Sequence, residues 1–489
     1  MERITLEYLF KGIPTAFIQG PKDVQITGLT SNSKLVQPGN LFIAKKGLTT
    51  DGAKFIPGAV AAGARAILTD AYNPLYPDIA QIIHPNAADI EGLLAKEFYG
   101  TPEGKLFLVG ITGTNGKTTT SYLVRHLLEK RGEKCGLIGT IEWIVNDKVS
   151  PSSKTTPDLL QNYKLFHEMV SAGLHACAME VSSHALDQGR VQGIEFDVAV
   201  FTNLTQDHLD YHLTMEDYAA AKAKLFTSLK KGEKQSSKTA VINADCPYSQ
   251  QIIAGCTENV IRYGILEPCD LQASSIDLSP SGMQFTLSFQ GREQRMISPL
   301  IGRYNVYNLL AAAGVGLAKG FTLEEIAESF HSFFQVPGRL ERVPNPKGLD
   351  IFVDYAHTDD ALLNVLKTLQ EIKKGRLITI FGCGGDRDRD KRPKMGAVAT
   401  AFSDLAIVTS DNPRGEDPEE IIRQVLAGIE NPGQVLVFVD RKEAIEKALS
   451  LARPSDIVLI AGKGHEKTQI FSDRTISFDD RAIAAHFFL

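Results

Sequence analysis

The sequence predicts an α/β protein built from three domains. The chain has 489 residues, enough for three domains of the usual ~100–200 residues each. Apolar runs that alternate with longer amphipathic stretches indicate parallel strands joined by crossover helices. Proline, glycine and charged residues concentrate between Gln335 and Asn345, which is typical of a linker. We therefore expect domains at residues 1–100, 101–336 and 337–489.

Each predicted domain has its own strands, seen as short apolar runs. The small amino-terminal α/β domain contains runs at residues 40–44 and 66–68. The central domain should hold a mainly parallel sheet, with runs at residues 106–109, 175–179, 197–201 and 240–242. The carboxyl-terminal domain should be Rossmann-like, because apolar runs recur between helical patterns at residues 349–353, 377–381, 405–408, 435–438 and 457–460.

The overall composition indicates an ordinary globular protein. Hydrophobic residues make up 43% and charged residues 22%, and a net charge of −6 argues against binding to nucleic acid. The first residues lack a basic start with an apolar core, and no run of ~18 apolar residues occurs. Six scattered cysteines without paired spacing fit reduced thiols. We therefore expect a cytoplasmic monomer with no membrane or nucleic-acid partner.

A glycine-rich segment predicts a phosphate-binding loop. Its sequence, Gly110-Ile-Thr-Gly-Thr-Asn-Gly-Lys-Thr-Thr-Thr120, follows an apolar run and precedes a helical pattern. Glycines let backbone N–H groups turn toward phosphates, Lys117 can neutralise the β/γ oxygens, and Thr118 can offer a hydroxyl to Mg²⁺. The general pattern requires glycine at position 111, where this chain has Ile111. We predict a P-loop-type ATP site formed by Gly113, Thr114, Asn115, Gly116, Lys117, Thr118 and Thr119.

Polar residues follow the next two apolar runs of the central domain. Ligands of open α/β sheets bind beyond the carboxyl ends of the strands. Glu180 directly follows one run, and His208 lies in the polar segment after the next. A carboxylate and an imidazole at these places can each bind a metal beside the phosphate loop. A helix-capping or loop carboxylate and a hydrogen-bonded loop histidine are the alternatives.

In the carboxyl-terminal domain, polar and charged residues likewise follow three of the apolar runs. Glycine, arginine and acidic residues concentrate at residues 382–392, 411–414 and 462–466. Arginine pairs bidentately with a carboxylate, and acidic groups accept hydrogen bonds from an ammonium. This mixture suits a zwitterionic ligand, whereas three solvated loops with unrelated charges are the alternative.

These motifs together resemble the Mur ligase family, ATP-dependent amide-forming enzymes of peptidoglycan precursor synthesis. The resemblance covers essentially the whole chain and rests on segments in the family's order, at residues 112–119, 155–158, 179–184, 202–212, 302–308, 353–357 and 382–386. It implies three domains that bind a UDP-sugar, ATP and an amino acid, in that order. It further implies addition of meso-2,6-diaminopimelate to UDP-MurNAc-L-Ala-D-Glu through an acyl phosphate, with ATP as substrate and Mg²⁺ as cofactor.

The resemblance also implies which residues bind each ligand. For ATP it adds Asn305, Asn308, Arg339 and Asp354 to the phosphate loop. For the UDP-MurNAc-dipeptide it implies Ser31, Ser33, Leu48, Thr49, Thr50, Thr155, Thr156, Ser182, Gln188 and Arg190. For diaminopimelate it implies Arg387, Asp411, Asn412, Pro413, Arg414, Gly462 and Glu466. Arg414 and Arg387 suit the second carboxylate of diaminopimelate, which lysine lacks.

Lys222 matches a lysine that the family carries as a CO₂-derived carbamate. From the residues alone, a solvated lysine on a helix is the default interpretation. A carbamate is an anion and can bind Mg²⁺, whereas an ammonium repels it. The resemblance therefore implies Thr118, Glu180, His208 and carbamylated Lys222 as the metal site, and Lys117, Lys222, His208 and Glu180 as the catalytic residues.

Three other functions are weighed against this one. A lysine-adding muramyl ligase would lack the arginine motif that ends at Arg414, and a folylpolyglutamate synthetase would lack the domain ahead of the ATP loop. An ATP-hydrolysing switch that forms no amide bond would leave the three charged segments of the last domain unexplained.

Overall fold

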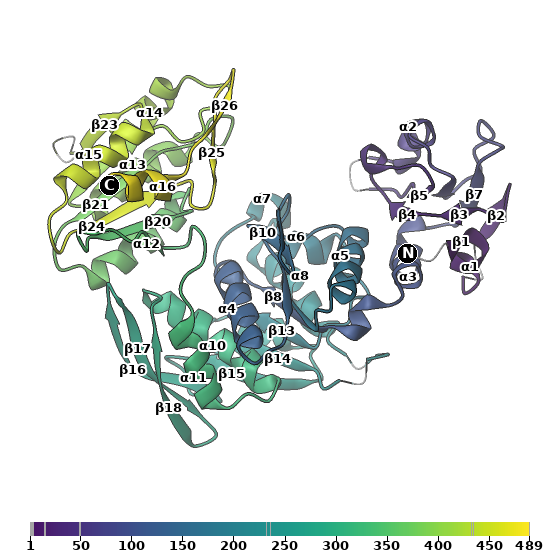
Figure 1. Cartoon of the computed structure of the whole chain (residues 1–489), viewed down its shortest axis with the longest axis horizontal. Helices are drawn as coiled ribbons and strands as arrows, with labels where there is room; N and C mark the ends of the chain where they lie inside the picture. Colours follow the sequence, from purple (N-terminus) through teal and green to yellow (C-terminus); the bar gives the residue numbers. More distant parts are fainter. Residues whose placement is uncertain are drawn as a thin grey trace. The chain divides into compact units, whose positions relative to one another are not determined.

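The computed structural model describes residues 4–13, 16–47, 50–230, 232–234, 236–431, 433 and 435–488. It divides into two compact units, one of residues 1–117, 128–242 and 246–261, and the other of residues 118–127, 243–245 and 262–489. Three larger sheets follow one another along the chain (Figure 1), as the predicted three-domain α/β class requires. The boundaries near residues 100 and 336 stay predictions.

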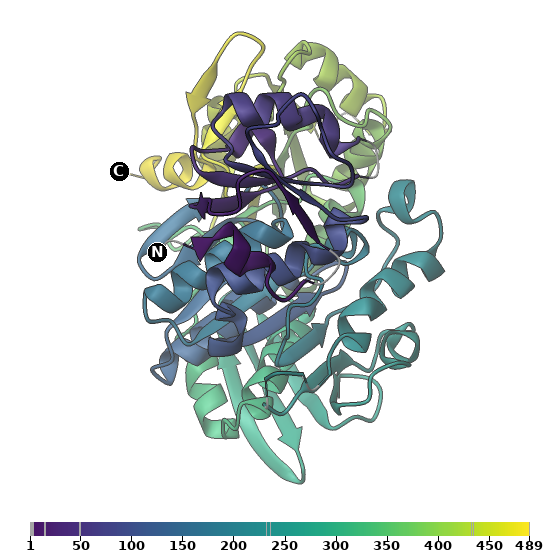
Figure 2. The same ribbon diagram turned by 90° about the vertical axis from the view of Figure 1, so that its right-hand side faces the viewer.

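The amino-terminal sheet has its strands in the order β2-β7-β6-β5-β4, and β4 to β7 are parallel. Leu41 and Ile43 pack with α3 on one face of the sheet, whereas Phe42 and Ile67 pack with α2 on the other. The helices of this domain accordingly lie on both faces of its sheet (Figure 2). The alternation follows from the two-residue period of a strand. The elements are β1 (Ile4–Thr5), α1 (Leu6–Phe10), β2 (Phe17–Gln19), β3 (Gln25–Ile26), β4 (Gly28–Thr30), β5 (Asn40–Ile43), α2 (Ile56–Ala61), β6 (Ala66–Thr69), β7 (Ala80–Ile83) and α3 (Ala87–Tyr99).

The central sheet runs β11-β10-β9-β12-β8-β13-β14-β15-β16-β17-β18, and β9, β12, β8, β13 and β14 are parallel. Its elements up to β14 are β8 (Phe107–Thr112), α4 (Lys117–Lys130), β9 (Cys135–Ile138), β10 (Glu142–Val145), β11 (Lys148–Pro151), α5 (Leu159–Ser171), β12 (Ala176–Glu180), α6 (Ser183–Asp187), β13 (Val198–Phe201), α7 (Leu209–His212), α8 (Met215–Thr227) and β14 (Thr239–Asn243). The later elements are α9 (Ser249–Ile253), β15 (Asn259–Gly264), β16 (Leu271–Ser279), β17 (Gly282–Phe289), β18 (Arg292–Ser298), α10 (Arg303–Ala318) and α11 (Leu323–Ser332).

Two antiparallel parts of the central sheet were not predicted. The β10–β11 hairpin turns at Asn146, which has a φ of +54°, and strands β16, β17 and β18 form an antiparallel meander. The meander strands are half-exposed, so their polar residues interrupt the apolar runs on which our strand prediction relied. The mainly parallel character of the sheet around the phosphate loop is confirmed.

The carboxyl-terminal sheet runs β19-β20-β24-β21-β22-β23, with all strands except β19 parallel. Phe352 packs with α12, α13 and α14 on one face, whereas Ile351 and Val353 pack with α15 and α16 on the other. This confirms the predicted Rossmann-like arrangement. The elements are β19 (Glu341–Arg342), β20 (Asp350–Asp354), α12 (Asp359–Ile372), β21 (Leu377–Phe381), α13 (Lys391–Phe402), β22 (Leu405–Thr409), α14 (Pro418–Leu426), β23 (Val435–Phe438), α15 (Arg441–Leu451), β24 (Ile457–Ala461), β25 (Thr468–Ile470), β26 (Thr475–Ser477) and α16 (Asp480–His486).

A buried ion pair joins α15 to α16 and to the end of β24. Nε and Nη2 of Arg441 each donate to a carboxylate oxygen of Asp480 at 2.8 Å, and Nη2 also donates to the carbonyl oxygen of Ala461. Both side chains are fully buried. Across the ranges given above, none of the helices is both long and apolar enough for a membrane span.

Replacing Arg441 with methionine should lower the free energy of unfolding by about 3–5 kcal/mol, because Asp480 would keep an unpaired buried charge. Urea unfolding of the whole chain measures this. The double variant Arg441→Met, Asp480→Leu is the control and should lose less stability than the single variant. A single variant that unfolds at the wild-type urea concentration would contradict the prediction.

Candidate functional site

The glycine-rich loop after β8 is held by residues that follow the neighbouring strand β13. Gly113 and Gly116 have φ angles of +151° and +87°, which residues other than glycine rarely adopt. A Cβ on Gly113 would lie 1.9 Å from Oγ1 of Thr202. That hydroxyl donates to the carbonyl oxygen of Asn115 at 2.6 Å, and Oδ1 of Asn203 accepts a bond from the Asn115 N–H at 3.0 Å. The loop therefore depends on Thr202 and Asn203, which our predicted site omitted although both directly follow an apolar run.

The side chain of Lys117 closes the loop that precedes it. Its Nζ donates to the carbonyl oxygens of Gly113 at 2.8 Å and Thr114 at 2.9 Å. Thr118 and Thr119 are buried in the first turn of α4. An ammonium group beside the N-terminal N–H groups of a helix forms a binding site for an anion such as phosphate.

Lys222 lies buried on α8, with 1% of its surface exposed. Its Nζ lies 4.3 Å from the centre of the Tyr218 ring, and the Tyr218 hydroxyl is hydrogen-bonded to Oγ1 of Thr114 in the loop at 3.2 Å. Burial, followed by the charge of Lys117, lowers the pKa of Lys222 well below its ordinary value, although Asp207 acts in the opposite direction. A neutral amine is therefore favoured next to the phosphate loop.

Glu180, the last residue of β12, is fully buried in a cluster of polar residues. Its carboxylate accepts hydrogen bonds from the N–H of Thr140 at 2.8 Å and from the hydroxyl of the same residue at 2.9 Å. The hydroxyls of Thr140 and Thr155 are 3.1 Å apart, and the hydroxyl of Thr156 donates to the carbonyl oxygen of Glu180 at 2.9 Å. A Cβ on Gly139 would lie 2.5 Å from Oε1 of Glu180, so this glycine makes room for the carboxylate.

Arg190 and Gln188 belong to the same cluster of polar residues. Nη1 of Arg190 donates to the carbonyl oxygen of Thr156 at 3.0 Å, and Nη2 donates to Oε1 of Gln188 at 2.5 Å. The N–H of Ser182 donates to Oγ1 of Thr156 at 3.0 Å. The structure therefore brings together the residues predicted to hold the muramoyl peptide, which lie on separate segments of the chain.

His208 lies among aromatic rings and carries a left-handed backbone, with a φ of +54°. Its ring packs against that of His184 with centroids 4.9 Å apart, and its Nε2 lies 3.5 Å from a carboxylate oxygen of Asp207. Burial is the main factor that lowers the pKa of His208, His184 and His212. A neutral imidazole is favoured, which is the form that binds a metal.

The predicted residues of the UDP-sugar site are placed only in part. Leu48 and Thr49 lie outside the described residues. Ser31 and Ser33 are partly exposed, and Thr50 is exposed, in the amino-terminal domain. Their contact with the uridine part of a substrate stays a prediction.

The predicted adenine-binding residues form a buried pair on α10. Nδ2 of Asn308 donates to Oδ1 of Asn305 at 2.8 Å, and Nδ2 of Asn305 donates to the carbonyl oxygen of Ile301 at 2.9 Å. The hydroxyl of Thr120 on α4 donates to Oδ1 of Asn308 at 3.5 Å. These contacts connect α10 to the helix that begins at the phosphate loop.

Arg339 and Asp354 lie at the beginning of the carboxyl-terminal domain. The carboxylate of Asp354 is buried, and it accepts hydrogen bonds from the N–H groups of Leu340 at 2.7 Å and Ala356 at 2.8 Å. Burial raises the pKa of this carboxyl group. The guanidinium of Arg339 lies 5.5 Å from the centre of the Tyr355 ring. Contact of either residue with ATP stays a prediction.

Four of the predicted diaminopimelate residues converge at the ends of β22 and β24. Nδ2 of Asn412 donates to Oε2 of Glu466 at 2.9 Å. Nζ of Lys463, which is fully buried, lies 3.0 Å from Oδ1 of Asn412 and 3.2 Å from Oε2 of Glu466. A Cβ on Gly462 would lie 2.7 Å from Oδ2 of Asp411. Lys463 was not predicted, since a lysine in a polar loop usually points to solvent.

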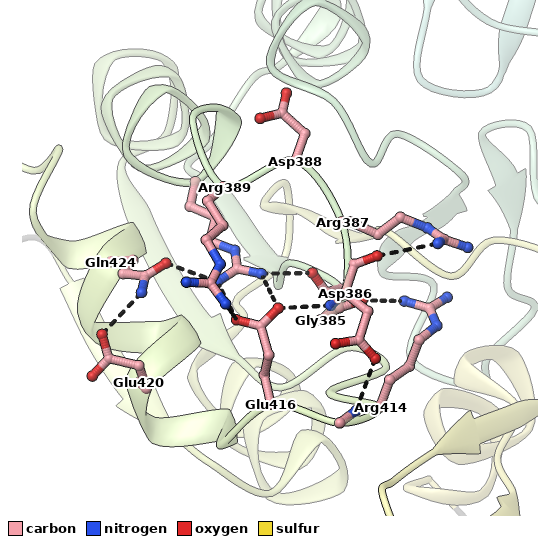
Figure 3. Close-up of polar contacts among 12 residues, drawn as sticks. Gly385, Asp386, Arg387, Asp388, Arg389, Arg414, Glu416, Glu420 and Gln424 are labelled. Carbon is pink, nitrogen blue, oxygen red and sulfur yellow. Dashed lines mark hydrogen bonds and ion pairs between the residues drawn. The ribbon is translucent and has the colours of Figure 1, made fainter.

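The remaining predicted residues lie where the loops after β21 and β22 touch. Nη1 of Arg414 donates to the carbonyl oxygen of Gly385 at 2.9 Å, and a Cβ on Gly385 would lie 1.8 Å from the carbonyl oxygen of Pro413. Arg387 is exposed, and its guanidinium lies on the same side of the loop at Asp386 as that of Arg414 (Figure 3). Two cations therefore face one side of these loops.

Three sequence models of the Mur ligase family, which the motifs of this chain resemble, each match one segment of the chain. They are the Mur ligase family catalytic domain at residues 25–99, the Mur ligase middle domain at 111–316 and the Mur ligase glutamate ligase domain at 338–464. The UDP-N-acetylmuramoyl-L-alanyl-D-glutamate–2,6-diaminopimelate ligase of Geobacillus thermodenitrificans is 44% identical over 481 residues, 98% of both chains. The chain belongs to the Mur ligase family. A second relative of the same name, from Bacillus cereus, is 44% identical over 94% of this Mur ligase and 93% of its own length.

Solved structures show the same fold. A structure of UDP-N-acetylmuramoyl-L-alanyl-D-glutamate–2,6-diaminopimelate ligase covers 99% of both chains with a TM-score of 0.72 and 33% identity. Folylpolyglutamate synthase of Mycobacterium tuberculosis matches 75% of this chain and 91% of its own, with a TM-score of 0.60 and 20% identity. That second likeness concerns the fold alone.

Replacing Gly113 with alanine in this Mur ligase should weaken binding of a non-hydrolysable ATP analogue at least about tenfold, because the new methyl group would displace Thr202 and open the loop. Isothermal titration calorimetry measures the affinity. Gly104→Ala is the matched control, since its Cβ would meet Thr101 at an ordinary 3.7 Å. Equal affinities for the Gly113 variant and the wild type would contradict the prediction.

Proposed function

We propose that this Mur ligase uses ATP to join meso-2,6-diaminopimelate to UDP-MurNAc-L-Ala-D-Glu in peptidoglycan precursor synthesis. Arg414 carries the proposal, because it adds a guanidinium to the loops that also present Asn412 and Glu466. Arginine pairs bidentately with a carboxylate, and diaminopimelate has a second carboxylate where lysine has none. The names of relatives at 41–45% identity support the same substrate.

The reaction has two chemical steps. The γ-phosphoryl group of ATP passes to a carboxylate oxygen of the acceptor's glutamate, which releases ADP and forms an acyl phosphate. The unprotonated amine of diaminopimelate then attacks the carbonyl carbon, the C–O bond to phosphate breaks, and the amide forms with loss of a proton. Lys117 neutralises the transferring phosphoryl group, and Arg190 pairs with a carboxylate of the acceptor peptide. Catalysis is mostly positioning and charge neutralisation.

The residues beside the phosphate loop suit Mg²⁺ with mixed ligands. Among the described residues, no group of three or more histidine, cysteine or acidic side chains converges to hold a metal ion. The proposed ligands are therefore the hydroxyl of Thr118, the carboxylate of Glu180, the imidazole of His208 and a carbamate on Lys222, directly or through water. A bound Mg²⁺ supplies positive charge to the phosphate oxygens.

The environment of Lys222 favours the carbamate. CO₂ adds only to a neutral amine, forming an N–C bond and releasing a proton. Burial lowers the pKa of Lys222 and so favours its neutral amine, and within the described part of the chain Nζ forms no ion pair. Glu180 and Lys222 would then act through the metal, which makes both of them catalytic residues.

Each domain has a main ligand in this proposal. Residues 1–100 bind the UDP-sugar, residues 101–336 bind ATP and the peptide, and residues 337–489 bind diaminopimelate and contribute Arg339 and Asp354 to the ATP site. The substrates are small molecules that the cytoplasm supplies, so we place a monomeric enzyme there.

A lysine-adding ligase is the nearest competing function, and Arg414 argues against it because lysine would leave this guanidinium unpaired. The fold likeness to folylpolyglutamate synthase covers less of the chain. A switch that only hydrolyses ATP would have no use for the amino-acid loops.

The purified protein with ATP, Mg²⁺ and UDP-MurNAc-L-Ala-D-Glu should release phosphate with meso-diaminopimelate and at least about tenfold more slowly with L-lysine, because an unpaired arginine costs ~1–3 kcal/mol or more. Mass spectrometry of the UDP-MurNAc-tripeptide identifies the product. Equal use of lysine would overturn the substrate, and phosphate release without any amino acid would favour the switch.

Lys222→Ala should reduce ligation more than about 100-fold, because the metal would lose an anionic ligand. A short-chain carboxylate added to this variant should restore part of the activity. Lys224→Ala is the matched control, since Lys224 lies on the same helix at the surface, paired with Asp187. Carbon-13 NMR with labelled bicarbonate should show a carbamate signal in the wild type and in Lys224→Ala but not in Lys222→Ala. Unchanged turnover of Lys222→Ala would remove the carbamate.

A further inference from the structure

Glu416, in the loop that also carries Arg414, forms ion pairs with Arg389 in the loop that carries Arg387 and with Arg392 in the first turn of α13. Nη1 and Nη2 of Arg392 donate to the two carboxylate oxygens of Glu416, each at 2.9 Å. The Arg392 side chain is fully buried, and that of Glu416 is 12% exposed. Two parallel bonds of this kind restrict both the distance and the orientation of the partners. We call these two residues the Arg392–Glu416 pair.

The pair holds the glycine-rich loop by its backbone. Oε1 of Glu416 accepts a hydrogen bond from the N–H of Asp386 at 2.6 Å, and Nη2 of Arg392 donates to the carbonyl oxygen of Gly384 at 3.2 Å. In return, Oδ2 of Asp386 accepts a bond from the N–H of Gly415 at 3.0 Å. These hydrogen bonds hold Gly384 and Asp386, the residues on either side of Gly385, whose carbonyl oxygen accepts the hydrogen bond from Arg414.

Arg392 is itself anchored to α14. Its Nη1 donates to Oε1 of Gln424 at 2.7 Å, and Gln424 in turn donates to Glu420 at 2.9 Å. The Arg392–Glu416 pair therefore connects helices α13 and α14 to the loops that follow β21 and β22.

Arg414 depends on this arrangement for its direction. Its backbone has a φ of +52°, and its N–H donates to the carbonyl oxygen of Ile470 at 3.0 Å. Its Nη1 donates to the carbonyl oxygen of Gly385 at 2.9 Å, whereas its Nε and Nη2 form no hydrogen bond within the described ranges. That second edge of the guanidinium is the one that a ligand carboxylate can use.

Glu416 is two residues from Arg414 and is an obvious competitor for its charge. Hydrogen bonds, first from Arg392 and then from the N–H of Asp386, lower the pKa of Glu416 to about 2, so the carboxyl group is ionised at neutral pH. If this carboxylate paired with Arg414, a ligand carboxylate would have to displace it. Arg392 donates to both of its oxygens instead, and Nη2 of Arg389 lies 3.2 Å from Oε2.

We propose that Glu416 and Arg392 are positioning residues that orient Arg414 and keep its guanidinium available, and so set the preference for an amino acid with a second carboxylate. The inference rests on the proposed function. Neither residue touches the substrate in this proposal, and both act through Arg414.

The test compares steady-state kinetics of Glu416→Gln and the wild type with meso-diaminopimelate and L-lysine. Glutamine keeps the length of the side chain but weakens the pair and frees Arg392, so KM for diaminopimelate should rise about tenfold, the effect of one lost charge-assisted hydrogen bond. KM for ATP should stay within about threefold, because the phosphate loop is untouched. The ratio of kcat/KM for diaminopimelate over lysine should fall by a similar factor.

Two further variants separate positioning from folding. Glu419→Gln is the matched control, because Glu419 is exposed in the first turn of α14 and lies outside the contacts that lead from Arg392 to Glu420, and its kinetics should equal those of the wild type. Arg392→Lys keeps the charge but cannot form both bonds, so it should give an intermediate preference, and it serves if Glu416→Gln fails to fold. An unchanged substrate ratio in either folded variant would overturn the inference. A wild type that does not prefer diaminopimelate would instead overturn the proposed function.

Discussion

The candidate site depends on the parallel alignment of β12, β8 and β13. Because these strands run in one direction and in register, Glu180 pairs with Ile111, and Phe201 pairs with Thr112. Their polar carboxyl ends therefore meet at one edge of the sheet. Thr202 reaches the phosphate loop from this edge and donates to Asn115. A register shift of one residue would send these side chains to the opposite face.

The two proposed substrate regions share a way of placing charge. Lys117 is bonded to carbonyl oxygens of the loop that precedes it, and Arg414 is bonded to a carbonyl oxygen of a neighbouring loop. Backbone acceptors hold each cation without neutralising it, since a carbonyl group carries no net charge. A carboxylate partner would have competed with an anionic ligand for the cation. Glu416, two residues along the chain from Arg414, instead accepts the bidentate hydrogen bonds from Arg392.

Sequence patterns predicted many of the strands that are buried on both faces, but they missed the buried strands β7 and β9, and they also predicted the partly exposed β23. Strands such as β8, β12 and β21 are continuous apolar runs because helices cover both sides of their sheets. The meander of β16 to β18 is partly exposed, so its strands carry polar residues and escaped prediction. The same limit applies to the sites. Lys463 and Arg392 look like solvated charges in the sequence, yet both are fully buried by neighbours from other segments.

The sequence alone determined the α/β class, the phosphate loop and the segments that bear chemistry, because these depend on local composition and on the order of apolar runs. The tertiary structure decided which of those segments meet. It grouped Thr156, Ser182 and Arg190 around Glu180, buried Lys222 and so lowered the pKa of its amine, and turned Arg414 toward Gly385. Distances between segments and the loss of solvent around a charge arise only when the sheets pack, so no local pattern of residues could have specified them.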